Sequence, residues 1–188
     1  GIERAPLEFA PGTARRYTNI TWAGVTAIVE HATGRAFEDE FGDLAAAISA
    51  EGLSFDTDDV HHVHGAERYD HDVAGLRALR HPAAGAAARA SDLLALGRSL
   101  RAGDDAVVHH VTLEAMLRPR TSGLPVIDPN RARHPEDFGI GFNLPYRPSL
   151  LDHSTFGHEG WCRSQFWVSR HTGRGVVLLT NRLDTTEP

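Results

Sequence analysis

The spacing of apolar and polar positions changes partway along the chain. In several stretches before about residue 135, apolar residues recur at intervals of three and four, which is the spacing of one face of an α-helix. After residue 137, apolar residues alternate with small or polar ones, as is typical of strands. This order predicts an α+β fold, with a helical lobe of about residues 20–135 and an antiparallel sheet of about residues 136–183.

Helix-starting and helix-stopping residues refine the helical part. We expect Thr18 or Asn19 to cap the first helix and Gly34 to end it, while Ser91 caps the third and Gly103 ends it. Residues 54–88 have little periodicity and predict a long loop with short helical pieces. The predicted helices span residues 20–34, 36–50, 91–103 and 112–118.

Alternation and turn residues predict an antiparallel meander of three or four strands. "FGIGFNL" (138–144) and "QFWVSR" (165–170) have strand patterns, and a further strand begins near "FGHEGW" (156–161). "HTGRG" (171–175) has the composition of a hairpin turn, and "VVLLTN" (176–181) that of a buried strand.

Composition excludes several classes of function. The formal charge of −6 is spread among interspersed acidic and basic residues without a basic stripe, which argues against nucleic-acid binding. Apolar runs such as "GVVLLT" (175–180) are far shorter than the ~20 residues of a membrane-spanning helix. The single cysteine, Cys162, permits no intrachain disulfide, and the first residues show no signal peptide, so localisation stays open.

All 19 residues counted as lysine or arginine are arginine. The chain therefore has no lysine, and no mechanism that needs a lysine can take it from this chain.

Four segments of the chain occur in an order typical of one family. They are "FAPGTARRYTNITWAGVTAIVEHATG" (9–34), "ASDLLALGRSLRAG" (90–103), "FGHEGW" (156–161) and "GVVLLTNR" (175–182). Together they resemble the serine β-lactamase-like hydrolases, which include DD-peptidases and esterases. The resemblance covers about residues 6–183 and implies a β-lactamase/transpeptidase-like fold. It also implies a serine hydrolase or acyltransferase that forms an acyl-enzyme with an ester, amide, β-lactam or D-peptide and needs no cofactor or metal.

The resemblance assigns roles to five residues. Tyr17 would be the proton-transfer partner of the serine, and Asn19 would hold a lysine and a substrate carbonyl. His158 takes the place where the family more often has lysine. Gly160 would let the backbone approach the substrate, and the Trp161 amide would donate to the oxyanion.

The family's Ser-x-x-Lys motif is missing, because it requires a lysine. The resemblance therefore implies that a complementary N-terminal segment or chain carries the nucleophile, so that residues 1–188 form a partial domain. In the complete fold that segment would also pair with the last strand. The other expected partner is a small-molecule or peptide substrate.

Two alternatives belong to different classes of function. One is a non-catalytic binding relative that keeps the groove without the nucleophile. The other is a zinc-dependent hydrolase that uses the histidine-rich loop, although a solvated loop at the pocket rim is the favoured interpretation. The candidate zinc ligands are His61, His62, His64, Asp70, His71 and Asp72.

Overall fold

The computed structural model describes residues 6–69, 71–101, 105, 107–128, 136–145 and 152–183. Within these ranges, five α-helices and a short 3₁₀-helix (Ala66–Tyr69) are joined to one antiparallel sheet of five strands in the order β1-β2-β3-β4-β5. The helices are α1 (Ile20–Thr33), α2 (Phe37–Ala47), α3 (Val73–Ala78), α4 (Ala90–Ser99) and α5 (His110–Met116). The strands are β1 (Glu136–Phe138), β2 (Asn143–Pro145), β3 (Thr155–Glu159), β4 (Gln165–Ser169) and β5 (Gly175–Leu178).

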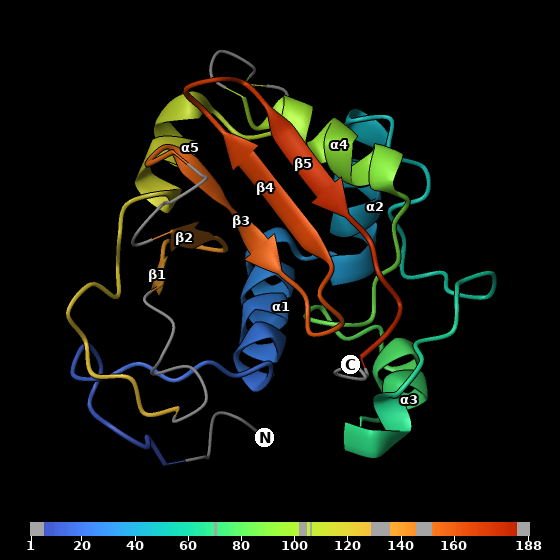
Figure 1. Cartoon of the computed structure of the whole chain (residues 1–188), viewed down its shortest axis with the longest axis horizontal. Helices are drawn as coiled ribbons and strands as arrows, with labels where there is room; N and C mark the ends of the chain where they lie inside the picture. The colour runs from blue at the N-terminus through green and yellow to red at the C-terminus, as the bar shows by residue number, and fades with distance from the viewer. Residues whose placement is uncertain are drawn as a thin grey trace, which may run out of the picture.

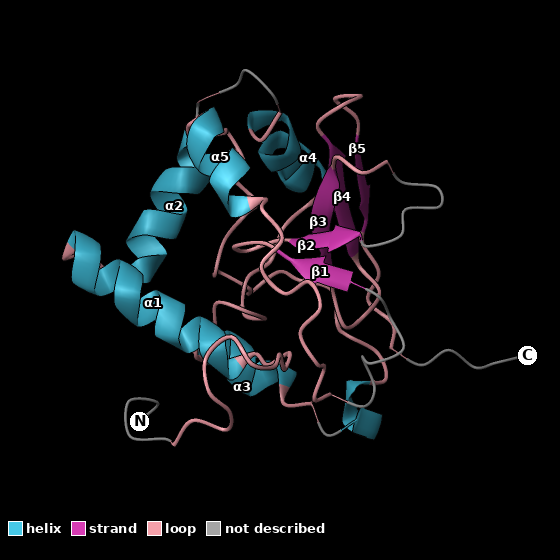
Figure 2. Cartoon of the chain, turned by 90° about the vertical axis from the view of Figure 1, so that its left-hand side faces the viewer, coloured by secondary structure: helices cyan, strands magenta, loops and turns pink. Residues whose placement is uncertain are grey.

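Figures 1 and 2 show the sheet with α1, α2, α4 and α5 on one side, and no described helix covers the opposite face. Phe156 pairs with Val168, and both are 1 % exposed in the core beneath α4 and α5. Because side chains alternate along strands, His158 points to this helical side as well. Val176 and Leu178 point to the opposite face and are 59 % and 52 % exposed.

The predicted α+β order and the helical positions are confirmed, including the end of the first helix. Gly34 has a positive φ of 70°, and its N–H donates to the Glu30 carbonyl (2.9 Å). The N-cap residue is Asn19, and the hydroxyl of the preceding Thr18 accepts the Ile20 N–H at 3.3 Å. Asn19 caps with its backbone carbonyl, which accepts from Trp22 N (3.1 Å), and its side chain has no capping bond to the described residues.

The prediction that Ser91 caps the third helix was wrong. Helix α4 begins one residue earlier, and the Asp92 carboxylate accepts the Arg89 N–H (2.9 Å) to close its first turn. An ionised carboxylate beside the free N–H groups satisfies the helix start better than an exposed hydroxyl does. The helix ends at Ser99, and Gly103 lies outside the described residues.

The prediction of one strand over residues 138–144 was also wrong. These residues contain the turn between β1 and β2, which pair through Asp137 and Leu144. The Gly139 N–H donates to Phe142 O (2.9 Å), and Gly141 has a φ of 81°, which a side-chain-bearing residue rarely adopts. The sheet therefore has five strands rather than three or four.

None of the helices in the described ranges is long and apolar enough to cross a membrane.

Candidate functional site

Tyr17 and His158 lie next to each other although 141 residues separate them in sequence. The Tyr17 hydroxyl lies 3.5 Å from His158 Nε2, and the ring centroids are 6.0 Å apart at an interplanar angle of 30°. His158 is fixed on β3 by its pairing with Phe166. Tyr17 follows an extended residue, Arg15, whose N–H and carbonyl bond to the backbone of Pro125 and Ile127 (both 2.9 Å). The pairing of β3 with β4 and the backbone hydrogen bonds of Arg15 therefore fix the positions of His158 and Tyr17.

The two side chains line a cavity of about 230 Å³. Its walls include the aromatic rings of Trp22, Phe138 and Phe142, and the Tyr17 ring packs 6.3 Å from that of Phe138. Aromatic rings beside one hydroxyl and one imidazole form a small, partly open pocket, which two arginines and three threonines also line.

A buried carboxylate supports one wall of this cavity. Asp137 on β1 is 3 % exposed and accepts hydrogen bonds from the Thr121 N–H (2.9 Å), the Thr121 hydroxyl (2.6 Å) and the Ser122 hydroxyl. Burial alone would raise the pKa of Asp137, but these donors and the Phe138 N–H outweigh burial and lower the pKa. Asp137 thereby fixes Thr121, which lines the cavity. Sequence reasoning missed this residue, because a carboxylate in an irregular segment has no periodic signal.

The other three predicted site residues do not line this cavity. Asn19 is exposed, and Gly160 lies just past the end of β3, where its N–H donates to the Ser164 carbonyl (2.7 Å). Trp161 is 39 % exposed and lines a separate groove. The structure therefore brings Tyr17 and His158 together and leaves Asn19, Gly160 and Trp161 outside their cavity.

The groove next to Trp161 has a volume of about 970 Å³, within the range of ligand-binding clefts. Its walls come from residues 51–63, helix α3, residues 84–89 and the ends of the strand loops, including Cys162. The cavity and the groove lie at neighbouring positions of the chain, because His158 on β3 lines the cavity and Trp161, just after β3, lines the groove.

The histidine-rich loop lies at the rim of this groove. The His71 ring meets the Trp161 ring edge-on, with centroids 4.5 Å apart. The loop is pinned to the segment after β5, because the His64 N–H donates to Asn181 O (2.8 Å) and the Asn181 amide donates to His62 O (2.9 Å). The backbone of this loop is thus held close to the segment that follows β5.

The zinc ligands suggested for this loop do not assemble within the described residues. His62 and His64 are neighbours, with ring centroids 4.9 Å apart. However, His61, His62, His64, His71 and Asp72 contribute no set of three ligand atoms within 4.8 Å of one another. Asp70 lies outside the described residues.

The two glycines of the "FGHEG" stretch have different roles. A Cβ on Gly157 would overlap the Phe166 carbonyl oxygen and lie 2.8 Å from its carbon, so Gly157 is required by the close approach of β4. A Cβ on Gly160 would find its nearest neighbour, Ser164 Cβ, at 3.5 Å. Of the two, only Gly160 would accept a Cβ at ordinary van der Waals distances.

Comparisons with known proteins match the whole chain to one family. The family model described as Beta-lactamase matches residues 1–188. A search of curated proteins found no match.

Solved structures share the fold. The chain is similar to a beta-lactamase from Mycobacterium bovis (20 % identity, TM-score 0.69), covering 93 % of this chain and 59 % of that one. It is also similar to EstCE1, a hydrolase with promiscuous acyltransferase activity (18 % identity, TM-score 0.68), covering 95 % of this chain and 54 % of that one. The chain thus spans between half and three-fifths of the length of these structures.

Proposed function

Because the chain belongs to the beta-lactamase family and has its fold, we propose that it supplies most of the active site of a serine hydrolase or acyltransferase. The reaction would pass through an acyl-enzyme formed from an ester, amide, β-lactam or D-peptide. The observation that carries the proposal is the Tyr17–His158 pair at 3.5 Å in a cavity with aromatic rings in its walls.

Tyr17 and His158 form the proton-transfer device in this proposal. When the serine oxygen attacks the substrate carbonyl, its proton moves to the Tyr17 oxygen while the Tyr17 proton moves to His158 Nε2. The reverse transfer delivers the proton to the leaving group when the tetrahedral intermediate collapses. A histidine suits this task because its unperturbed pKa of about 6.5 lets it take and return a proton near neutrality.

Asn19, Gly160 and Trp161 act at the edges of the same centre in this proposal. The exposed Asn19 amide is free to bind the catalytic lysine and a substrate carbonyl. Gly160 has no side chain that would hinder a substrate next to the Trp161 N–H, which donates to the oxyanion together with the N–H of the serine.

The serine and lysine come from a complementary segment that carries Ser-x-x-Lys. The chain itself has no lysine, and the matched structures are longer than the chain. Helix α1 supports a covering segment, since each of its residues keeps some exposure and Ile20 and Ile28 are 61 % and 68 % exposed. An apolar helix face of this kind needs a packing partner.

Tyr17→Phe tests the proposal in the protein assembled with its Ser-x-x-Lys segment. Loss of the hydroxyl should slow hydrolysis of an activated ester by ~10² or more, the usual scale for a positioned acid–base group, with the melting temperature unchanged. His158→Leu should behave similarly. His158→Gln, which can still hydrogen-bond, should keep part of the activity and flatten the lower limb of the pH–rate profile.

Covalent labelling completes the test. A fluorophosphonate should label the serine of Ser-x-x-Lys in the unmodified protein, and label more slowly in Tyr17→Phe. Equal labelling and equal turnover in both proteins would remove Tyr17 from the mechanism.

The missing lysine favours one second candidate, a non-catalytic binding relative. Such a protein would bind the same carbonyl compounds in its groove without covalent labelling or turnover. Saturable binding of a penicillin or a D-peptide, measured by calorimetry without product formation, would favour this candidate.

A further inference from the structure

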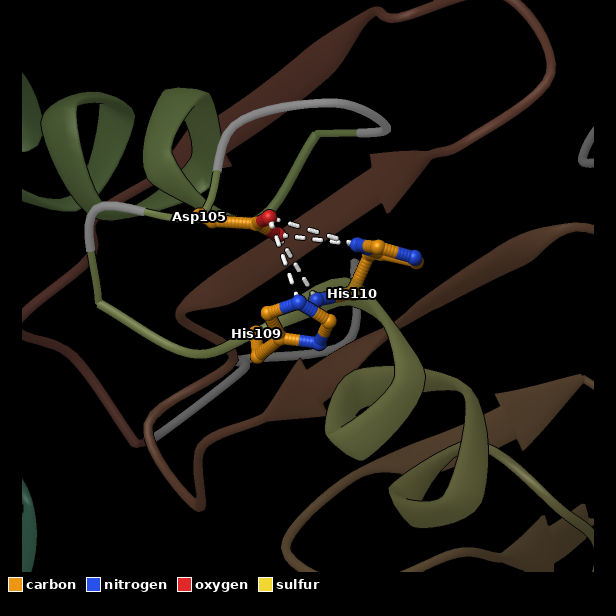
Figure 3. A group of neighbouring side chains, drawn as sticks. All are labelled: Asp105, His109 and His110. Atoms are coloured by element: carbon orange, nitrogen blue, oxygen red, sulfur yellow. Dashed lines mark hydrogen bonds and ion pairs between the residues drawn. The ribbon is translucent and has the colours of Figure 1, made fainter.

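Asp105, His109 and His110 gather at the start of α5, as Figure 3 shows. Each of the three offers one ligand atom, and these atoms lie within 4.8 Å of one another. None of the three lines the cavity of Tyr17 and His158 or the groove of Trp161. The cluster is therefore independent of the proposed active site.

The backbone and the carboxylate already hold the cluster together. Asp105 Oδ1 accepts the His110 N–H (2.7 Å), and the Asp105 carboxylate oxygens lie 3.2 and 3.3 Å from His110 Nδ1. His109 Nε2 lies 3.7 Å from Asp105 Oδ2, and the two imidazole rings are 4.2 Å apart between centroids. Both rings thus present a nitrogen to the same carboxylate.

We propose that Asp105, His109 and His110 bind one divalent transition-metal cation, with zinc as the best fit. Imidazole nitrogen and carboxylate oxygen are ligands that zinc takes at about 2.0–2.2 Å. Two such ligands in tetrahedral geometry lie roughly 3.3 Å apart. The separations of 3.2 and 3.7 Å between the carboxylate and the two imidazole nitrogens are close to this value.

The exposure of the three side chains determines access for the cation, and the tautomer of His109 determines which nitrogen coordinates it. The side chains of Asp105, His109 and His110 are 43 %, 60 % and 47 % exposed, so a cation reaches them directly and water completes its coordination. His109 Nδ1 accepts the Val111 N–H at 3.4 Å. Coordination through His109 Nε2 places the proton on Nδ1 and gives up this bond, which is long and exposed and therefore weak.

The bound cation would link the connection after α4 to the start of α5. Helix α5 is anchored in the core by Leu113, which is 2 % exposed and belongs to the same cluster as Phe156 and Val168. A cation that binds only the folded arrangement stabilises it by mass action.

The test is titration of the untagged 188-residue protein with Zn²⁺ by calorimetry and with Co²⁺ by absorption spectroscopy. One cation should bind per chain at this site, and Co²⁺ should give the visible bands of a low-coordinate nitrogen–oxygen site. Asp105→Asn and His110→Ala should each weaken binding by at least ~10-fold, the lower end of what even an indirect partner of a metal ligand contributes.

A matched control replaces His61, His62 and His64, another cluster of histidines, by alanine. Binding at this site should be unchanged in the control. Absence of binding in the unmodified protein would overturn the proposal, and so would full affinity in both Asp105→Asn and His110→Ala. Loss of binding in the control with retention in these two variants would assign the cation to the histidine-rich loop instead.

Discussion

Asp152 ties the two central strands together through side-chain hydrogen bonds. Its carboxylate accepts from the Ser154 hydroxyl just before β3 and from the Ser169 hydroxyl (2.5 Å) at the end of β4. It also accepts the Ser154 N–H (2.8 Å). These hydrogen bonds lower the pKa of Asp152 to about 2, because all of them favour the ionised form.

This pKa predicts how stability depends on pH. The pKa of Asp152 is about 2 in the folded chain and 3.8 unperturbed, so its stabilisation is complete above about pH 4 and is lost as the pH falls toward 2. Asp152→Asn should therefore lower the urea midpoint at pH 7, and its difference from the unmodified protein should shrink between pH 4 and pH 2. Glu159→Gln, which alters an exposed carboxylate at the other end of β3, is the control. A deficit for Asp152→Asn that is the same at pH 7 and pH 2 would contradict the prediction.

The role of a single residue could be predicted where the residue belongs to a motif. It could not be predicted where the role depends on a contact with another side chain. Motifs singled out Tyr17 and His158 as site residues, and the structure places the Tyr17 hydroxyl 3.5 Å from His158 Nε2. At the start of α4, the buried Asp92 carboxylate (3 % exposed) accepts the Arg89 N–H, and the Ser91 hydroxyl does not cap the helix. Asp137 was not predictable, because its partner Thr121 is 16 residues away.

At the level of elements, strand β3 contributes residues both to the core and to the cavity of Tyr17 and His158. It pairs with β4 over five residue pairs and carries Phe156 into the core and His158 into the cavity. Gly157 between them allows the backbone of Phe166 to approach. Strand β3 therefore needs Gly157 for packing, whereas Gly160, just past its end, is the glycine to which the proposal assigns substrate access.

The two glycines make a matched pair of substitutions. Gly157→Ala should destabilise the fold by about 2–3 kcal/mol, because its Cβ meets backbone rather than a flexible side chain. Gly160→Ala should leave stability nearly unchanged. In the assembled protein, Gly160→Val should abolish acylation with only a small change in melting temperature. Chemical unfolding and labelling kinetics measure both; normal acylation by Gly160→Val would show that this strand end does not face the substrate.

Elements with a long, regular period were predicted well and the short hairpin was not. The pattern of α1 and α2 repeats over several turns, whereas residues 138–144 alternate for only a few positions. In this stretch Gly139 and Gly141 fit the alternating pattern of a strand, but they lie in the turn that joins β1 to β2. Local alternation does not distinguish a strand from a tight hairpin of two short ones.

At the scale of the whole molecule, one face of the sheet lacks a covering layer among the described residues, as Figure 2 shows. On β5, Val176 and Leu178 are exposed on this face, while Val177 between them points toward the helices and is half-buried. The sequence predicted that the last strand meets a further segment, because the resemblance implies one. The prediction of a buried strand over residues 176–181 was wrong, because burial depends on the register with β4, which places Val176 and Leu178 on the uncovered face.

The exposed face of β5 gives a prediction about assembly. If the Ser-x-x-Lys segment covers this face, the 188-residue chain alone should bind a hydrophobic dye and associate with itself at high concentration, because apolar surface of this kind promotes association. Replacing Val176 and Leu178 by aspartate should suppress both effects and change the free energy of unfolding by no more than about 1 kcal/mol, as for two surface substitutions. In the assembled protein the same change should weaken binding of the complementary segment, measured by sedimentation.

Val177→Asp is the control on the same strand, and it should destabilise the isolated chain by about 1–3 kcal/mol, because it places a carboxylate against α4. Equal assembly of the Val176 and Leu178 double variant and the unmodified protein would show that the complementary segment binds elsewhere, and α1 would then be the face to test.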